Sequence, residues 1–256
     1  MKTKIIDLSE SIFHESPSEP WPAKIRYLDH REGAEEMRQR FNVDPKDLVF
    51  SNGLGWSYEF IEAMTHTGTH LDAPWHFHPV SEGKLAKTID EIPLEWCYSD
   101  GVVLDMRHKR NGEFITVEDI QKELNRIQYK IKPLDIVLIM TGSDKRIGTK
   151  EYFQQPGLGR ESTLWLLNHG VKITGIDAYT FDRPFASMAQ DYKEKKDGSY
   201  IWPAHFAGIE KEYCHIEKLV NLDKIPKPFG FKVAVFPIKI HKASAGWVRA
   251  VAIIEE

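Results

Sequence analysis

Cysteine is scarce in this chain of 256 residues, and its two cysteines, Cys97 and Cys214, lie far apart. Their separation excludes a C-x-x-C motif, and with it a cysteine zinc site or a thioredoxin-like redox site. A single distant pair also gives no basis for a disulfide-stabilised secreted fold. The expected setting is therefore the reducing cytoplasm.

An excess of basic residues is also lacking. The chain has 34 Lys and Arg against 38 Asp and Glu, a formal net charge of -4. Nucleic-acid-binding domains usually carry a basic balance or a clustered basic face. The densest basic stretch, residues 192–197, is interrupted by acids and is typical of a solvated loop. We therefore expect no nucleic-acid partner.

Long apolar runs are missing as well. No stretch approaches 18 consecutive apolar residues, so we expect no transmembrane helix and no membrane partner. Near the N-terminus only Ile5 and Ile6 precede Asp7, which is too short an apolar run for a signal peptide. The remaining composition is ordinary, with 41% hydrophobic residues, enough for a chain of this length to bury a substantial core.

Five short apolar runs rich in β-branched residues predict β-strands. They cover residues 101–105, 134–140, 171–176, 231–236 and 248–254. Between the first three runs, helical periodicity predicts a helix over 117–128, capped by Thr116, and another over 162–169, ending at Gly170. This alternation favours βαβ units and a partly parallel sheet. A helix is also expected near 32–41, inside a region, 13–52, that we interpret as an N-terminal arm or lid.

Histidine is concentrated in one segment, where four of the eleven fall within 13 residues: His66, His70, His76 and His78. A single histidine in a fold is more often a surface or satisfied core residue than a ligand. Two imidazoles and a carboxylate close together change that balance, because His66, His70 and Asp72 form a common ligand set for Zn²⁺ or a similar ion. His78 is expected to point elsewhere, since Phe77 separates it from His76.

The spacing of these residues suggests how they meet. The β-branched threonines at 65, 67 and 69 favour an extended chain, in which alternate residues share one face. His66, His70 and Asp72 would then project together, with Gly68 leaving space between the imidazoles. Three protein ligands would leave a position for water, as a catalytic site needs. Pro74 should end the strand, so that His76 can return towards the metal and transfer protons.

The segment His66-Thr-Gly-Thr-His70-Leu-Asp72-Ala-Pro-Trp-His76-Phe closely resembles the H-x-G-T-H-x-D-x-P-x-H-F motif of the metal-dependent cyclase-like hydrolases. That family includes bacterial kynurenine formamidases and isatin hydrolases. Further segments resemble it at 6–9, 135–142, 175–177, 217–223 and 237–252, so the resemblance covers nearly the whole chain and is weakest over 13–52. It implies an α/β fold of the swivelling β/β/α type, a mixed sheet with flanking helices, as a single domain over residues 1–256.

The resemblance also implies a ligand set for two metals. His66, His70 and Asp72 would hold one ion, and Asp72 would bridge to a second ion held by His205 and Glu217. Taken alone, His205 is more typical of a packed aromatic turn, and Glu217 of a solvated acid. Zn²⁺ is the expected metal and Mn²⁺ the alternative, with one or two ions per chain.

Other roles follow from the same resemblance. His76 matches the family's catalytic histidine. The aromatic residues Trp75, Phe60 and Trp202 are candidates for contacts with a small-molecule substrate, although large aromatics are more often core residues. A homodimer or homotetramer is expected.

Three functional hypotheses remain open. The first is hydrolysis of a small amide by metal-bound hydroxide, with an arylformamide such as N-formylkynurenine as the substrate, which makes the protein a hydrolase of C–N bonds other than peptide bonds. The second is hydrolysis of a cyclic amide, imide or lactone with one metal. The third is a non-catalytic, metal-bound ligand-binding protein, against which the intact His76 argues. A G-x-S-x-G motif is missing, so a serine nucleophile is not indicated.

Overall fold

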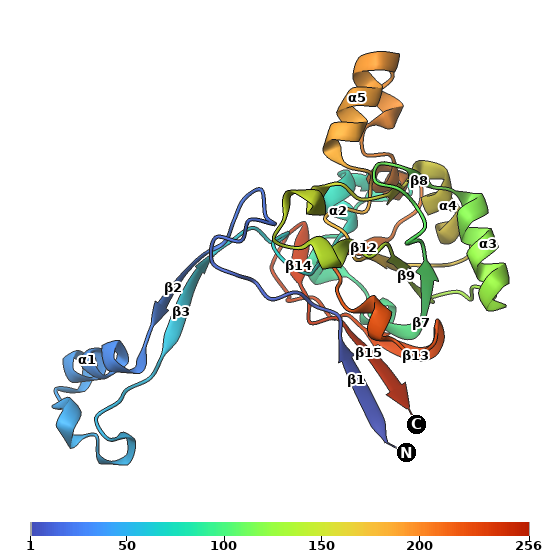
Figure 1. Ribbon diagram of the computed structural model, residues 1–256. Coiled ribbons are helices and arrows are strands. Elements are labelled where there is room, and N and C mark those ends of the chain that lie inside the picture. Colours follow the sequence, from blue (N-terminus) through green and yellow to red (C-terminus); the bar gives the residue numbers. More distant parts are fainter. Residues whose placement is uncertain (1, 256) are drawn as a thin grey trace. The chain divides into compact units, whose positions relative to one another are not determined.

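The structure is a computed structural model that describes residues 2–255. The chain forms two compact units, one made of the residues up to Ser11 and from Thr65 onwards, the other of Ile12–Met64. Both are drawn in Figure 1. The interpretation of residues 13–52 as an arm or lid stays a prediction. Over the described range, no helix combines the length and the apolar character that crossing a membrane requires.

The larger unit is built on a nine-stranded mixed sheet (Figure 1). Its strands are β1 (Thr3–Asp7), β4 (His70–Asp72), β7 (Tyr98–Asp105), β9 (Ile136–Met140), β11 (Ile173–Ile176), β12 (Cys214–Glu217), β13 (Phe229–Ala234), β14 (Ala245–Trp247) and β15 (Val251–Glu255). The strand order is β1-β15-β13-β7-β9-β11-β12-β4-β14. Strands β7, β9, β11 and β12 are parallel to one another, and the other pairs are antiparallel. The predicted mixed α/β fold with a partly parallel sheet is confirmed.

The parallel strands are buried on both faces, which explains their unbroken apolar sequences. In β9, Val137 and Ile139 pack into one core cluster, while Ile136 and Leu138 belong to a second cluster on the opposite face. This alternation is the two-residue period of a strand. The strand segments that carry the site are therefore held between two packed layers.

The described residues form six α-helices, which are α1 (His30–Phe41), α2 (Pro74–Phe77), α3 (Val117–Ile127), α4 (Arg160–Asn168), α5 (Phe185–Lys195) and α6 (Pro203–Phe206). Helices α3 and α4 connect the parallel strands as predicted, and Thr116 caps α3 by accepting a hydrogen bond from the Asp119 amide. The interpretation of residues 192–197 as a loop was wrong in part, because Tyr192–Lys195 is the last turn of α5. Lys, Glu and Gln favour a helix without apolar periodicity, and only Met188 of α5 is buried.

Short two-stranded sheets complete the fold. Their members are β2 (Lys24–Leu28) with β3 (Tyr58–Glu62), β5 (Val80–Ser81) with β6 (Lys84–Leu85), and β8 (Phe114–Ile115) with β10 (Gly157–Leu158).

The smaller unit contains the β2–β3 ribbon and α1. The predicted helix is present and starts at His30, because Asp29 and Glu32 form a capping box around its first turn. Gly33 lies against the backbone of Trp56, and a Cβ atom there would come within 1.8 Å of the Trp56 carbonyl oxygen. The close approach therefore requires glycine at this position.

Candidate metal centre

Strand β4 places Asp72 at the centre of the candidate site. Strand β4 lies between β12 and β14, and its register with β12 sets His215 opposite Asp72 and Glu217 opposite His70. Because alternate residues of neighbouring strands share a face, these four side chains gather on one side of the sheet. The side chains of Asp72, His70 and His215 are fully buried. The sheet itself therefore assembles most of the polar cluster.

A first group of donors comes from the motif segment, and we call His66, His70, Asp72 and His76 the motif cluster. The Nδ1 atom of His66 lies 2.8 Å from Asp72 Oδ1, and His70 Nε2 lies 3.1 Å from the same oxygen. His76 Nε2 lies 3.8 Å from Asp72 Oδ2. The structure thus brings together all four residues predicted at this site.

The path of the chain through this segment differs from the extended strand that we predicted. Only His70–Asp72 is strand, and residues 65–69 form a turn and bend in which Gly68 adopts φ 63°. Glycine reaches this left-handed conformation at little cost, which overrides the β-branched threonines around it. The bend is fixed by Thr69, whose hydroxyl bonds to the Lys218 carbonyl, and by Lys218 Nζ, which donates to the His66 carbonyl at 2.9 Å.

Helix α2 carries His76. Pro74 ends β4 as predicted and occupies the first turn of α2, where its missing N–H is not needed. The ring of His76 lies 4.1 Å from that of His66 and 5.3 Å from that of Trp202, measured between centroids. Its side chain is 21% exposed, so solvent or a substrate can reach it.

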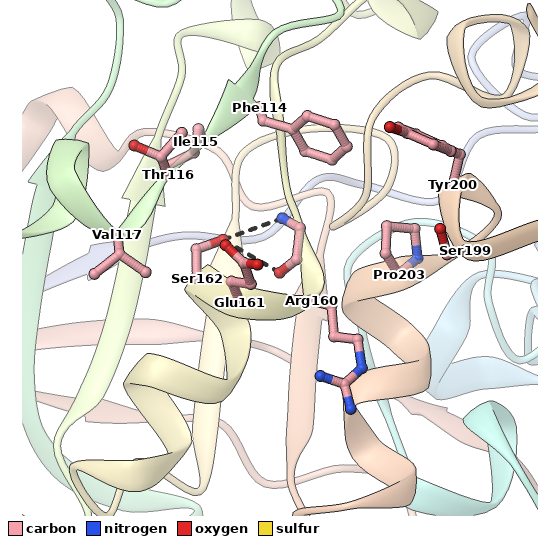
Figure 2. A pocket seen from close by; sticks show the side chains of 11 residues that line it. Phe114, Ile115, Thr116, Val117, Arg160, Glu161, Ser162, Ser199, Tyr200 and Pro203 are labelled. Carbon is pink, nitrogen blue, oxygen red and sulfur yellow. Dashed lines mark hydrogen bonds between the residues drawn. The ribbon is translucent and has the colours of Figure 1, made fainter. Parts of the chain in front are cut away.

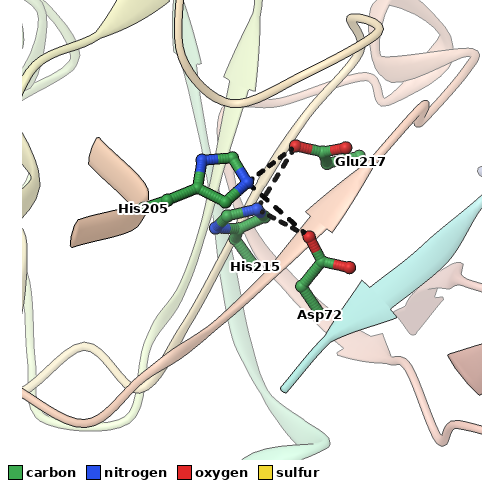
Figure 3. Close-up of side chains that lie close together, drawn as sticks. All are labelled: Asp72, His205, His215 and Glu217. Atoms are coloured by element: carbon green, nitrogen blue, oxygen red, sulfur yellow. Dashed lines mark ion pairs between the residues drawn. The ribbon is translucent and has the colours of Figure 1, made fainter. Parts of the chain in front are cut away.

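A second group, which we call the distal cluster, consists of Asp72, His205, His215 and Glu217 (Figure 3). His215 Nε2 lies 3.1 Å from Asp72 Oδ2 and 3.3 Å from Glu217 Oε1. His205 Nε2 lies 3.9 Å and 3.6 Å from the same two oxygens. The four side chains point towards one another in Figure 3, so the predicted residues His205 and Glu217 do meet Asp72.

Other residues hold the distal side chains in place. Asp182 accepts hydrogen bonds from His205 Nδ1 at 2.5 Å and from the His205 amide. Thr180 and Phe181 donate to Glu217 Oε1 from a hydroxyl and an amide, at 3.0 and 2.9 Å. A histidine that donates its other ring N–H to a carboxylate is the usual arrangement behind a metal ligand.

The donor atoms test whether a cation fits this site. His70 Nε2, His215 Nε2 and both carboxylate oxygens of Asp72 are buried and have no hydrogen-bond partner. The nitrogens lie 3.1 Å from Asp72 oxygens, but an N–H on either ring would not be aligned for a hydrogen bond to them. Unpaired polar atoms in a dry interior are strongly disfavoured. Imidazole and carboxylate donors that converge without bonding one another fit a divalent metal ion.

The carboxylates and His76 differ in their ionisation at neutral pH. Burial would raise the pKa of Asp72, but the histidines around it hold that pKa well below its usual value. Burial also opposes ionisation of Glu217, yet His215 lowers its pKa to about 2. Burial lowers the pKa of His76 to about 3. Both carboxylates are therefore ionised at neutral pH, while His76 is uncharged.

Two of the three predicted substrate contacts, Trp75 and Trp202, belong to the larger unit. Trp202 stacks on His205, with centroids 4.3 Å apart and planes 4° from parallel, so its ring lies beside both clusters. Trp75 precedes His76 on α2 and is 39% exposed. Phe60 belongs to the smaller unit, on β3 beneath the Arg26 guanidinium, and its role stays a prediction.

Sequence reasoning missed His215. The signal was present, because His215 and Glu217 are two residues apart and would share a face if residues 214–217 formed a strand. Four residues containing a histidine and a glutamate gave no apolar pattern from which to predict that strand. Asp182 was missed for a different reason, since it reaches the site only through tertiary contacts.

A hollow of about 370 Å³ elsewhere in the larger unit offers no competing site (Figure 2). Phe114 and Tyr200 line it, together with the first turn of α4. Two of its polar side chains are engaged, since Ser162 bonds to the backbone of Gly159 and Arg160 pairs with Glu210. None of the predicted metal ligands lines it.

The sequence and the fold are similar to those of known proteins. The family model described as "Cyclase: Putative cyclase" matches residues 6–183, more than half of the chain. A kynurenine formamidase of Bacillus thuringiensis (strain Al Hakam) is 26% identical over 230 residues, covering 84% of this chain and 95% of that protein. An isatin hydrolase of Roseibium aggregatum is 23% identical over 215 residues, covering 80% and 77%.

Solved structures share the fold. A crystal structure of an isatin hydrolase bound to the product analogue thioisatinate matches with a TM-score of 0.77 at 19% identity, covering 99% of this chain and 93% of that one. The structure of a potential metal-dependent hydrolase with cyclase activity matches with a TM-score of 0.66 at 20% identity, over the whole of both chains. At such low identity the likeness shows an isatin-hydrolase-like fold and nothing finer.

Proposed function

The chain belongs to the cyclase family, and from that premise we propose that it is a metal-dependent hydrolase that cleaves a small amide. An arylformamide such as N-formylkynurenine is the substrate that we favour, because the sequence is similar to kynurenine formamidases over 84% of its length. The bond cleaved would be a C–N bond other than a peptide bond.

One observation carries this proposal. Buried nitrogen and oxygen donors converge around Asp72 without hydrogen-bonding one another. In our proposal His66, His70 and Asp72 hold one ion, while Asp72 bridges to a second ion held by His205 and Glu217. A divalent cation bound there would lower the pKa of a water molecule and polarise a substrate carbonyl.

Hydrogen bonds orient the two histidines for this role, and at His70 they also fix the tautomer. The Nδ1–H of His70 donates to the Gly68 carbonyl at 2.8 Å, which leaves the lone pair of Nε2 facing Asp72. His66 Nε2 lies 3.0 Å from Ser244 Oγ, so its Nδ1 faces Asp72. Rings oriented in this way need no reorganisation when a cation binds.

His76 is the proposed proton-transfer residue. It is part of the motif cluster, yet its Nε2 stays 3.8 Å from Asp72, farther than the nitrogens of His66 and His70. Burial lowers its pKa to about 3, so the ring is uncharged at neutral pH, and we propose that it relays a proton from water to the leaving amine. Partial exposure of the side chain supports contact with a substrate.

Aromatic side chains support a flat substrate. The ring centroids of Trp202 and His76 lie 5.3 Å apart, and Trp75 precedes His76 on α2. Stacking on an indole would orient an aryl group beside the proton-transfer residue. Phe60 is kept in the proposal as a third contact.

Several finer predictions belong to the same proposal. They are a fold of the swivelling β/β/α type, Zn²⁺ as the metal with Mn²⁺ as the alternative, a cytoplasmic location, and a homodimer or homotetramer. The free, buried thiols of Cys97 and Cys214 support a reducing compartment.

Hydrolysis of a cyclic amide, imide or lactone is the second candidate. The similarity to an isatin hydrolase at 23% identity, close to the value for the formamidase, favours keeping it. A single ion per chain would support this branch over the first.

The test is turnover by purified protein supplied with Zn²⁺ or Mn²⁺, using N-formylkynurenine and isatin in parallel. His76→Ala should remove activity and retain metal, while His78→Ala should keep both, because His78 bonds to the Val80 backbone and joins neither cluster. Faster formamide cleavage supports the first candidate, and faster isatin cleavage the second. Metal-loaded protein that turns over no activated amide, ester or lactone would contradict the hydrolase proposal and leave a binding protein.

A further inference from the structure

His215 is a buried, potential ligand to which the proposed two-metal site assigns no role. It lies on β12 directly opposite Asp72, with its side chain fully buried. The rings of Phe77 and Phe181 stack against it, with centroids 5.0 and 4.8 Å away and planes tilted by 21° and 19°. Packing therefore fixes the plane of this imidazole.

The tautomer of His215 is fixed by Tyr213. The hydroxyl of Tyr213 has one proton, which it donates to the Ala204 carbonyl at 2.9 Å. The same hydroxyl lies 3.2 Å from His215 Nδ1, so in that contact it accepts the Nδ1–H. In the neutral ring, the lone pair is thereby on Nε2, the nitrogen that lies nearest to Asp72 and Glu217.

The distances from His215 fit a tetrahedral metal. Bonds of about 2.0–2.1 Å from a tetrahedral zinc to its ligands correspond to about 3.3–3.4 Å between ligand atoms. His215 Nε2 lies 3.1 Å from Asp72 Oδ2 and 3.3 Å from Glu217 Oε1. Glu217 Oε1 already accepts two hydrogen bonds, so the lone pairs that this carboxylate retains for a metal are those of its other oxygen, Oε2.

We propose that His215 is a fourth protein ligand at the distal cluster, completing a closed site with Asp72, His205 and Glu217. This inference rests on the proposed function, because it concerns the same metal centre. It adds a ligand that the motif does not contain.

The rival reading is that His215 is a charged imidazolium that neutralises the two carboxylates in place of an ion. Two observations oppose it. His215 Nε2 lies 3.1 and 3.3 Å from the two carboxylates, but an N–H on it would not be aligned for a hydrogen bond with either, so in the metal-free protein only charge attraction would hold an imidazolium there. His205 donates its Nδ1–H to Asp182, so the lone pair of its Nε2 lies near the same two carboxylates. A charged His215 would leave that lone pair of His205 facing negative oxygens without a cation or a proton between them.

A closed distal site would give the two metal positions different roles, one structural and one catalytic. Structural zinc sites have four protein ligands, whereas catalytic sites keep one position open. The distal side chains are at most 9% exposed, while His66 and His76 of the motif cluster are 16% and 21% exposed. The distal ion would therefore be retained tightly, and substrate would meet the ion at the motif cluster.

The test measures metal retention. Wild-type protein, His66→Ala and His215→Phe are loaded with Co²⁺ or Zn²⁺ and dialysed against a chelator, and the remaining metal is counted by elemental mass spectrometry. We expect one ion per chain to survive in the wild type and in His66→Ala. His215→Phe should bind that ion at least about 100-fold more weakly and lose the intense visible absorption of tetrahedral Co²⁺.

A His215→Phe variant with unchanged affinity and an unchanged Co²⁺ spectrum would overturn the proposal. So would loss of the retained ion in His66→Ala only, since the tight site would then be the motif cluster. If His215→Phe does not fold, Tyr213→Phe decides, because it removes the acceptor for Nδ1–H. In Tyr213→Phe we expect the distal ion to be retained about 10-fold more weakly. Unchanged retention in that variant would overturn the inference. Failure of the proposed function would give a different result. The protein would then show the expected pattern of metal retention but would hydrolyse neither an amide nor a lactone.

Discussion

The motif cluster and the distal cluster share Asp72 but differ in how the chain supplies their donors and in how far solvent reaches them. The motif donors come from eleven consecutive positions, 66–76, and the side chains of His66 and His76 are partly exposed. The distal donors come from α6 and β12 and are buried. A partly open cluster can admit a substrate, whereas a closed one can hold an ion securely.

The largest expected effect comes from removing what the clusters share. Asp72→Asn should abolish metal binding at both positions and lower activity at least about 10⁴-fold, because proton transfer and charge stabilisation both depend on the centre. Elemental analysis and turnover check this.

Asp177→Asn is the matched control for that variant. Asp177 is also buried, and its two oxygens accept from the amides of Thr141 and Gly142, so the NH2 group of an Asn would face an N–H donor and cost stability, as a buried Asp-to-Asn change generally does. It bonds to Thr141 and Gly142 and belongs to neither cluster, so metal content should not change. If both variants lost metal equally, general destabilisation rather than Asp72 would be the cause.

His76→Ala should separate chemistry from metal binding at the motif cluster. We expect activity to fall about 10²- to 10³-fold, the usual contribution of a general acid–base residue, with metal content unchanged. Steady-state kinetics beside metal analysis would show it. Loss of metal together with activity would instead make His76 a ligand and erase the functional difference between the clusters.

The distal cluster should govern how the metal-free protein responds to pH. Burial would lower the pKa of His215, but Asp72 and Glu217 outweigh it and raise that pKa to about 9, against an ordinary value of 6.5. Because the pKa of His215 is higher in the folded state than in the unfolded state, its protonation stabilises the folded protein. This contribution is fully present below pH 6.5 and is lost as pH rises through about 9.

Wild-type protein kept metal-free should therefore lose up to roughly 3 kcal/mol more unfolding free energy than His215→Phe over that interval. Urea unfolding with chelator present, at about pH 6 and about pH 9.5, measures the difference. Equal pH dependence in the two proteins would remove His215 from this account.

The smallest expected effect concerns the orientation of a single ring. Ser244→Ala removes the hydrogen bond to His66 Nε2 and should weaken metal binding at the motif cluster about 10-fold. The distal ion should be unaffected, which is the reverse of the pattern expected for Tyr213→Phe. Competition titration with a chromophoric chelator resolves the two affinities, and a change at both positions would show that the clusters do not behave separately.

The same contrast explains what could be predicted from the sequence. The strands β7, β9 and β11 were predicted because burial on both faces gives them continuous apolar residues. The motif cluster was predicted because its ligands are neighbours in the chain, although the turn at Gly68 replaced the expected strand. His205 and Glu217 were predicted only through the family resemblance.

What could not be predicted depends on tertiary contacts. Strand β12 lacks an apolar pattern because His215 and Glu217 take up half of its four residues. Its partner β4 lies about 140 positions earlier in the chain, and only the register between them brings His215 to Asp72. The hydrogen bonds from Asp182 and Ser244 likewise depend on how distant segments pack.

The most direct test of the metal centre is anomalous X-ray scattering from crystals grown with Zn²⁺ or Mn²⁺, recorded on both sides of the metal's absorption edge. The account predicts two peaks on opposite sides of Asp72, one bound by His66 and His70 and the other by His205, His215 and Glu217. One peak at the motif cluster, with His215 hydrogen-bonded to a carboxylate, would contradict the closed distal site. No peak within bonding distance of Asp72 would contradict the metal centre itself.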